Sequence, residues 1–385
     1  MHYRNYGGTG YQVSALGLGC MRLPRNVNEE KGEAPVNREK AFELIRYAAD
    51  NGITYVDTAF GYHGTESEAV LGEALDGGRR EKVKIATKQP FGEMKTQGHI
   101  RRNLENTLKK LRSGYIDMYL IHNIQKHTWA DIKKRNIIEE FEKFRSEGLI
   151  RGIGFSYHGQ YPAFKEVLDF YDWDMCQIQQ NFMDLEREAT EEAIFQAGKK
   201  GCALVIMEPL RGGSLASPPA PVKAIYDAHP VQHAPVEWAF RHLLNYPQVS
   251  CILSGMTTLD QLKQNIEIFS KADAVPGCMT GEDKEMLARV KAKYDSIVMI
   301  PCTRCEYCTP CPQGVGIPEV FSLYNEGMMF GAFDQPRRGY MWTTRFHHEA
   351  SRCVACGACE KKCPQRIEII KNLHIAHEAL KGWLE

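Results

Sequence analysis

Eight of the thirteen cysteines stand in two short runs toward the end of the chain, at spacings that suit metal–sulfur ligation. The second run is Cys353, Cys356, Cys359 and Cys363, followed by Pro364. It has the C-x2-C-x2-C-x3-C-P pattern that ligates 4Fe–4S clusters. Two-residue gaps let a tight loop place three thiolates around one cubane. The displaced fourth cysteine, followed by proline, then ligates the other cluster.

The first run has the same beginning but a shorter final gap, because two residues instead of three precede its last cysteine. This gap could alter the local turn or leave one corner of a cluster weakly held. The exchange of fourth cysteines predicts one cluster on Cys302, Cys305, Cys308 and Cys363. It predicts the other cluster on Cys353, Cys356, Cys359 and Cys311. Two structural zinc ions are the alternative, since C-x2-C pairs also suit tetrahedral sites.

Four polar residues stand at or just after apolar runs in the first third of the chain. Asp57 ends "ITYVD", Tyr62 follows five residues later, Lys88 ends "VKIATK" and His122 ends "MYLIH". Each alone is more often structural, and an Asp–Lys pair is more often a simple ion pair. Their placement at the ends of three consecutive predicted strands favours a shared catalytic role.

Reduction of a carbonyl is a reaction that these four side chains could share. Hydride addition requires a proton on the developing alkoxide. A free tyrosine titrates near pH ~10, and a neighbouring lysine ammonium stabilises the phenolate and lowers that pKa. We therefore expect Tyr62 to donate the proton, Lys88 to tune it, Asp57 to position Lys88, and His122 to orient the substrate oxygen.

The elements that must hold these residues are predicted by alternating patterns between about residues 15 and 270. Apolar, β-rich runs occur at 15–20, 52–57, 83–88, 116–122, 150–156, 175–181, 203–208 and 249–255. Amphipathic helical patterns between them include 37–51, 99–111, 137–148, 189–201 and 258–270. Eight such strands predict a (β/α)8 TIM barrel. A doubly wound open sheet is the alternative, weakened by the absence of a G-x-G-x-x-G turn after the first strand.

Beyond the barrel pattern the sequence changes character. One more helix is expected at 281–296, after which "MIPCTRCEYCTPCPQGVGIP" breaks the pattern with proline, glycine and cysteine. Further helices are expected at 318–333, with Pro318 in the first turn, and at 371–384. We therefore predict a barrel domain over 1–296 and a small, mainly helical, ferredoxin-like iron–sulfur domain over 297–385.

The composition sets outer bounds on function. The 385 residues include 48 basic and 48 acidic side chains, and this balance gives no long-range attraction to nucleic acid or anionic lipid. No stretch approaches the ~18 apolar residues of a membrane span. The first residues have no apolar core of signal-peptide type. Together with cysteines grouped as for metal ligation, this predicts a cytoplasmic protein with no nucleic-acid or membrane partner.

Over roughly residues 1–275 the chain resembles the aldo-keto reductase family. The resemblance rests on "YRNYGGTGYQVSALGLGCMRL", "YVDTAFGYHGTESEAVLGEAL", "IATKQ", "IDMYLIHN" and "GIGFS". The family's catalytic tetrad would fall on Asp57, Tyr62, Lys88 and His122. The whole chain is similar to the branch of that family with a C-terminal ferredoxin-type module.

The resemblance also implies contacts with a nicotinamide cofactor. Ser156 and Gln177 match the pair that holds the carboxamide, although Tyr157 replaces the Asn that usually follows the serine. Met207 stands where an aromatic ring usually stacks, and Gly255 and Gln261 stand near the usual phosphate-binding positions. Asn265 matches an adenine contact, and Arg211 is the candidate substitute for the missing phosphate ligands. The full set that the resemblance implies is Gly19, Cys20, Met21, Asp57, Ser156, Gln177, Met207, Pro209, Leu210, Arg211, Gly212, Gly255, Gln261 and Asn265.

These patterns predict an NAD(P)H-dependent reductase of a small carbonyl compound, coupled through its clusters to a carrier such as ferredoxin or flavodoxin. The missing basic residues favour NADH over NADPH. A flavin is the alternative cofactor, because it converts electron pairs into the single electrons that clusters carry. The alternatives in function are an electron-transfer protein whose barrel reduces no carbonyl, a redox sensor, and a radical enzyme that uses S-adenosylmethionine.

Overall fold

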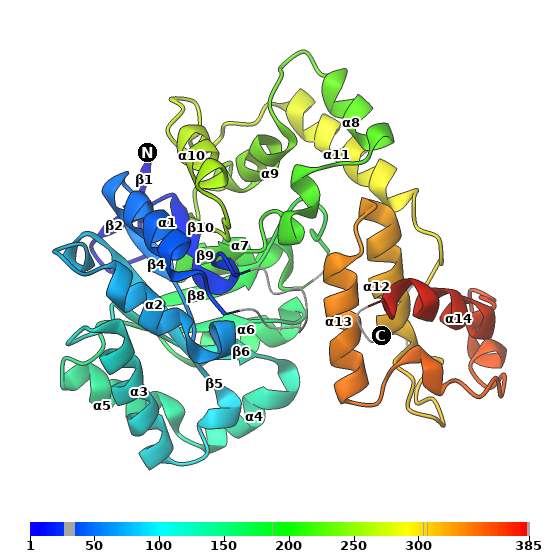
Figure 1. The fold of residues 1–385 in the computed structure, drawn as a ribbon, viewed down its shortest axis with the longest axis horizontal. Helices are drawn as coiled ribbons and strands as arrows, with labels where there is room; N and C mark the ends of the chain where they lie inside the picture. The colour runs from blue at the N-terminus through cyan, green and yellow to red at the C-terminus, as the bar shows by residue number, and fades with distance from the viewer. Residues whose placement is uncertain (27–34, 187, 303, 306, 383–385) are drawn as a thin grey trace. The chain divides into compact units, whose positions relative to one another are not determined.

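Eight parallel strands close into a barrel, in the order β10-β3-β4-β5-β6-β7-β8-β9 (Figure 1). The computed structural model describes residues 1–26, 35–186, 188–302, 304–305 and 307–382. The strands are β3 (Leu16–Gly19), β4 (Tyr55–Asp57), β5 (Lys84–Pro90), β6 (Met118–Ile124), β7 (Ile153–Tyr157), β8 (Met175–Gln179), β9 (Ala203–Met207) and β10 (Val249–Ser254). Each overlaps one predicted run, so the predicted (β/α)8 barrel is confirmed and the open sheet is wrong.

The helices between these strands follow from apolar spacing and capping. In α3, for example, the buried residues Ile100, Leu104 and Leu111 recur along one face, and the Thr96 side chain accepts the His99 N–H at the start. The helices of the barrel are α1 (Arg38–Asp50), α2 (Ser67–Ala74), α3 (Gln97–Leu111), α4 (Lys126–Lys134), α5 (Ile137–Ser146), α6 (Tyr161–Phe170), α7 (Thr190–Lys199), α9 (Pro235–Leu244) and α10 (Leu259–Ile268).

The barrel interior is a packed apolar cluster, closed at one end by the antiparallel hairpin of β1 (Tyr3–Asn5) and β2 (Gln12–Ser14). Tyr6, just after β1, donates a hydrogen bond from its hydroxyl to that of Tyr55 at 3.1 Å. The cluster is formed by Tyr6, Val13, Tyr55, Ala86, Met118, Leu120, Met175, Ala203, Val205, Cys251 and Leu253. Because side chains alternate along a strand, the next inward-facing position on each strand lies one layer above this cluster.

The chain forms two compact units, residues 1–211 with 237–280, and residues 212–236 with 281–385. Helix α11 (Gly281–Asp295), predicted at the end of the barrel domain, belongs to the second unit, where it packs against α8 (Ala220–Asp227). The ring of Tyr294 in α11 also packs on Phe330, with centroids 4.8 Å apart. This contact is between residues far apart in sequence, which a change in local composition does not reveal. The boundary at residues 296 and 297 remains a prediction.

The C-terminal part of the second unit is mainly helical, as predicted. Its elements are α12 (Ile317–Phe330), α13 (Asp334–Arg345), the short 3-10 turns η6 (Ala350–Arg352) and η7 (Glu360–Lys362), and α14 (Ile369–Leu380). Helix α13 has no counterpart among the elements predicted from the sequence. Helices α12 and α14 pack against each other, and their apolar faces form a core that also contacts six of the clustered cysteines.

Among the helices that the structure describes, none has the length and apolar character needed to cross a membrane.

Candidate functional site

The predicted tetrad lies at the end of the barrel where the strands terminate. Asp57 and Lys88 each lie two residues beyond a member of the interior cluster, Tyr55 and Ala86, so their side chains form the layer above it. His122 on β6 lies two residues beyond Leu120 in the same way. Tyr62 begins the turn η2 (Tyr62–Thr65), which follows β4. The barrel register therefore brings together four residues that span 66 positions of sequence.

The ammonium of Lys88 is the centre of this arrangement. The side chain is 1% exposed, and its Nζ donates to Asp57 Oδ1 at 2.5 Å and to the Thr58 carbonyl at 2.8 Å. The same Nζ lies 3.3 Å from the Tyr62 hydroxyl. A buried charge is costly unless it is paired and hydrogen-bonded, and these contacts supply both. Lys88 thus couples β4, β5 and η2 at one point.

The electrostatic environment keeps the Tyr62 hydroxyl protonated. Burial raises the pKa of Tyr62, and this effect exceeds the opposing attraction of the Lys88 ammonium. The expectation that Lys88 lowers this pKa below that of a free tyrosine is therefore wrong for the net effect, although Lys88 does act in that direction. Burial lowers the pKa of Lys88, but Asp57 and Tyr62 outweigh it and the net pKa is raised. The lysine therefore stays charged at neutral pH.

His122 is a neutral partner in this site. Burial lowers its pKa to about 3, and the charges of Lys88 and of the nearby His158 add to the effect. Its ring lies 6.0 Å from the Tyr62 ring, centroid to centroid, at an interplanar angle of 79°. A neutral imidazole has one N–H donor and one acceptor nitrogen, which suits a hydrogen bond to a substrate oxygen next to the phenol.

Two buried side chains on neighbouring strands fit the carboxamide of a nicotinamide. Ser156 and Gln177 are each 1% exposed, and Ser156 Oγ accepts the Asn123 backbone N–H at 2.8 Å, which leaves its own O–H to donate. Gln177 Nε2 lies 3.8 Å from Met207 Sδ, whereas Gln177 Oε1 is buried and has no hydrogen-bond partner among the residues that the structure describes. A buried acceptor without a donor is unfavourable. An amide N–H of a bound ring would satisfy it.

The residues expected at the adenine end of the cofactor are used differently. Gln261 Oε1 accepts the backbone N–H groups of Thr257 and Thr258 and so caps helix α10. Asn265 is 3% exposed, and its Nδ2 donates to Ser254 Oγ at 3.0 Å. Gln261 therefore fixes the start of α10, whereas Asn265 joins the later part of that helix to the end of β10. Their roles as cofactor contacts remain predictions.

The predicted loop residues after β3 lie beside this region. Gly19 ends β3, Met21 is 55% exposed, and Cys20 is buried with its carbonyl accepting the Ser67 hydroxyl at 3.2 Å. One residue further on, Arg22 lies against Gly255, where a Cβ on that glycine would be 3.1 Å from Arg22 Cδ. Arg22 is not among the residues predicted from the sequence, because nothing in the sequence shows that it adjoins β10.

The loop after β9 contains the remaining predicted contacts. Pro209 is buried and Leu210 is partly buried. Arg211 lies 3.6 Å from the buried Asp184 carboxylate, so its charge already has a partner. Gly212 has a φ of 69°, a left-handed conformation that favours glycine, and it begins the part of the loop assigned to the second unit. Glu208, just before these residues, lies 3.5 Å from Arg22.

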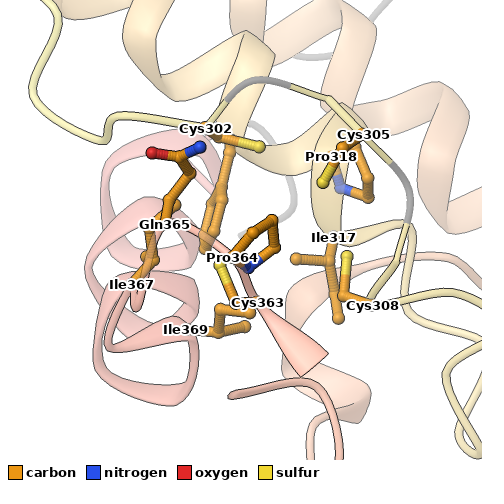
Figure 2. A pocket seen from close by; sticks show the side chains of 11 residues that line it. Cys302, Cys305, Cys308, Ile317, Pro318, Cys363, Pro364, Gln365, Ile367 and Ile369 are labelled. Carbon is orange, nitrogen blue, oxygen red and sulfur yellow. The ribbon is translucent and has the colours of Figure 1, made fainter. Parts of the chain in front are cut away.

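In the second unit the eight clustered cysteines surround two separate pockets. One pocket is lined by Cys302, Cys305, Cys308 and Cys363, together with apolar residues of α12 and α14 (Figure 2). The other is lined by Cys353, Cys356, Cys359 and Cys311. This is the grouping that the ferredoxin spacing predicts, including the exchange of the fourth cysteine of each run. Four thiols around one apolar hollow fit a 4Fe–4S cluster.

The walls of the two pockets are braced by bonds between distant segments. Ile317, the first residue of α12, lines both pockets, so one side chain separates them. Tyr340 OH accepts the Ala350 N–H at 2.9 Å and lies 2.7 Å from His377 Nδ1, which fixes η6 just before Cys353. Arg352 Nε donates to the Gln313 carbonyl at 3.0 Å and so joins the two cysteine runs.

A closed eight-stranded barrel with a polar layer of this kind at its strand ends is the architecture of a barrel enzyme. The family model for the aldo/keto reductase family matches residues 15–274, and one for a 4Fe-4S dicluster domain matches residues 301–368. The chain belongs to the aldo/keto reductase family and carries a C-terminal 4Fe–4S dicluster domain.

Individual relatives match the barrel part. "Probable aldo-keto reductase 1" of Glycine max is 29% identical over 236 residues, which are 58% of this chain and 65% of that protein, slightly less than two thirds of its length. "Uncharacterized oxidoreductase YrpG" of Bacillus subtilis is 31% identical over 235 residues, covering 56% of this chain and 68% of that protein.

Solved structures share the fold. Aldo-keto reductase AKR11C1 from Bacillus halodurans in its holo form has a TM-score of 0.62 at 25% identity and covers 75% of this chain and 96% of its own. An aldo-keto reductase from Klebsiella pneumoniae in complex with NADPH has a TM-score of 0.60 at 22% identity, covering 76% and 96%. The second likeness concerns the fold alone.

The two cysteine pockets generate a prediction about metal content. Anaerobically prepared protein should contain about eight iron atoms and about eight acid-labile sulfides per chain, because each pocket has four thiols. Cys311→Ser should lower the iron content toward about four, since only the second pocket loses a thiol, whereas Cys278→Ser, outside both pockets, should leave it unchanged. Iron and sulfide analysis checks this. Zinc without acid-labile sulfide in the native protein would contradict it.

Proposed function

We propose that the chain reduces the carbonyl group of a small molecule at the C-terminal end of the barrel, with Tyr62 as general acid, and that its clusters connect this reaction to an electron carrier. The observation that carries the proposal is the Lys88 ammonium, which lies 3.3 Å from the Tyr62 hydroxyl while Asp57 holds it at 2.5 Å. A phenol beside a fixed, buried cation is suited to release its proton as negative charge develops on a substrate oxygen.

Each residue of the tetrad has a separate task in this proposal. Tyr62 holds the proton, since burial raises its pKa and keeps the hydroxyl protonated at neutral pH. Lys88 stabilises the phenolate that remains after transfer, and Asp57 fixes the position of Lys88. His122, neutral because its pKa is lowered to about 3, donates a hydrogen bond that orients the substrate oxygen. The remaining requirement is a source of two electrons.

A nicotinamide cofactor supplies hydride when bound, and the family membership supports this cofactor for the barrel. Ser156 and Gln177 would hold its carboxamide, because Ser156 keeps a free O–H and Gln177 Oε1 is a buried acceptor without a donor. Met207 would contact the ring through its thioether, as sulfur does with aromatic rings. The flavin alternative would use the same end of the barrel.

The dicluster domain supports the electron-transfer part of the proposal. Clusters carry single electrons, and two cysteine pockets that share the side chain of Ile317 are close enough for exchange between clusters held in them. The protein's contribution here is to hold both cysteine sets in one apolar core, which also sets how far each cluster is shielded from solvent. A ferredoxin or flavodoxin is the proposed external carrier.

The tetrad generates the central prediction. Tyr62→Phe should lower kcat for carbonyl reduction by ~10²–10⁴-fold and leave cofactor affinity nearly unchanged, because the phenol acts only as charge develops on the substrate. Lys88→Met should cost a similar factor, and the double variant should cost little more than either, since the residues act as one unit. Steady-state kinetics and cofactor titration of the three variants measure this. Tyr115→Phe removes a hydroxyl from a partly buried ring of the same unit that Arg80 and Arg151 contact, and it is the matched control.

The pH dependence follows from the same pKa shifts. An acid whose pKa is raised stays protonated up to a higher pH, so activity should fall only as pH rises above about 10. The activity should show no step near pH 6.5, because the pKa of His122 is far below that value.

Full activity of Tyr62→Phe on the natural substrate would overturn the reductase mechanism. The alternative, an electron-transfer protein whose barrel reduces no carbonyl, would then remain.

The altered adenine end generates a prediction about nucleotide choice. NADH and NADPH should bind with dissociation constants within about tenfold of each other, a difference of about 1.4 kcal/mol, since Gly255 and Gln261 offer no cation to the 2′-phosphate. Calorimetric titration of both nucleotides checks this. A hundredfold preference for NADPH would refute it. Arg22→Gln would then test a cation that lies beside Gly255.

A further inference from the structure

The two cysteine runs are unusually basic for this chain. Residues 301–312 and 351–367 contain five basic side chains, Arg304, Arg352, Lys361, Lys362 and Arg366, and only two acidic ones, whereas the whole chain is balanced at 48 of each. All five basic residues are exposed. The excess is therefore concentrated on the loops that would wrap the clusters, where a partner protein that exchanges electrons must approach.

The basic residues of the second run adjoin the pocket that Cys353, Cys356 and Cys359 line. The Arg352 guanidinium bonds the carbonyl of Gln313, which is itself a wall of that pocket. Lys361 and Lys362 form the turn η7 immediately after Cys359, and the Lys362 N–H donates to the Cys359 carbonyl at 3.2 Å. The three cations thus flank the loop from Cys353 to Cys359 along the chain.

Glu360, the acidic residue of the second run, does not neutralise the basic side chains at the surface. The Glu360 carboxylate accepts the backbone N–H of Ile370 at 3.0 Å, in the first turn of α14, where a helix N-terminus favours negative charge. Within the part of the chain that the structure describes, Lys361 and Lys362 take part in no ion pair. Their charge is therefore directed to solvent.

The loop between these basic residues also exposes an apolar side chain that lines the pocket. Val354 is 61% exposed, although it also lines the pocket, and Cys356 next to it is an exposed lining residue. An apolar centre within a charged rim is the usual layout of a protein–protein contact. Electron transfer requires short distances, and Val354 belongs both to this surface and to the wall of the pocket.

We propose that the surface formed by Arg352, Val354, Lys361 and Lys362 is the docking site for a small electron-carrier protein with an acidic face, of the ferredoxin kind. This inference rests on the proposed electron-transfer role. One electron crosses in each encounter: the cluster of the carrier is oxidised by one electron and the cluster of this chain is reduced by one, with no bond made or broken. Complementary charge would raise the rate of encounter and set the orientation.

The test uses the anaerobically prepared holoprotein and a reduced acidic ferredoxin as the probe. Lys361→Glu/Lys362→Glu should lower the second-order rate constant of electron transfer about tenfold or more at low ionic strength, within the ~10–10³-fold range of electrostatic steering. The difference from wild type should vanish near 1 M salt, where the Debye length is about 3 Å. Calorimetry with oxidised ferredoxin should show a weaker dissociation constant for the variant, independently of any turnover.

A matched control and a second variant make the outcome decisive. Lys133→Glu/Lys134→Glu makes the same charge change on two adjacent exposed lysines of α4 and should leave rate and affinity unchanged. Lys361→Gln/Lys362→Gln should give an intermediate loss. Cluster content and the electron count from dithionite titration are measured on every variant, so a misassembled protein is recognised.

Two results would overturn the inference. If charge reversal shifts the reduction potential but leaves ferredoxin affinity and salt dependence at wild-type values, the cations only balance the charge of the cluster. If ferredoxin neither binds the wild-type protein nor reduces clusters that dithionite reduces, carrier docking is wrong at this surface. Neither result touches carbonyl reduction at Tyr62, which the kinetics of Tyr62→Phe decide separately.

Discussion

The paired charge of Lys88 is the interaction on which the arrangement of the barrel's polar end depends. An ammonium that is 1% exposed requires fixed partners, because an uncompensated buried charge costs several kcal/mol. Asp57 and Thr58 supply them from the end of β4, and the Tyr62 hydroxyl supplies a third contact from η2. The turn accommodates this with left-handed backbone at His63 (φ 52°) and Gly64 (φ 60°). One charge therefore determines where two strands and a loop meet.

A comparable constraint governs the second unit, although it comes from sulfur positions and not from charge. Each pocket contains three cysteines of one run and the fourth cysteine of the other run, so neither run can form its site alone. The 40 or so residues between the runs are α12, α13 and their connections, and α12 contributes Ile317 to both pockets. The helical core and the two cysteine sets are thus mutually dependent. Metal binding of this type contributes to folding energy as well as to electron transfer.

How much of this could be predicted depended on how local the determining pattern is. Strand positions, the tetrad and the cysteine grouping follow from short periodic patterns, since side chains alternate along a strand and thiolate spacing is fixed by cluster geometry. The proximity of Arg22 to Gly255, the packing of α11 on α8 and helix α13 depend on contacts between distant segments. The sequence predicts a lowered pKa for Tyr62. Burial raises this pKa by more than the Lys88 charge lowers it, and burial cannot be predicted from the residues adjacent in sequence.

The same reasoning separates the two ends of the proposed cofactor site. At the ring end, Gln177 Oε1 is buried without a donor, which a folded protein tolerates where a ligand completes the bond. At the adenine end, Gln261 Oε1 accepts the backbone N–H groups of Thr257 and Thr258, and Asn265 Nδ2 donates to Ser254 Oγ, so these groups are already hydrogen-bonded within the protein. The resemblance to the family implies a cofactor contact at Gln177, Gln261 and Asn265 alike. Their hydrogen bonds differ, which supports the proposal that a cofactor in this barrel would be oriented by its ring and its carboxamide more than by its adenosine.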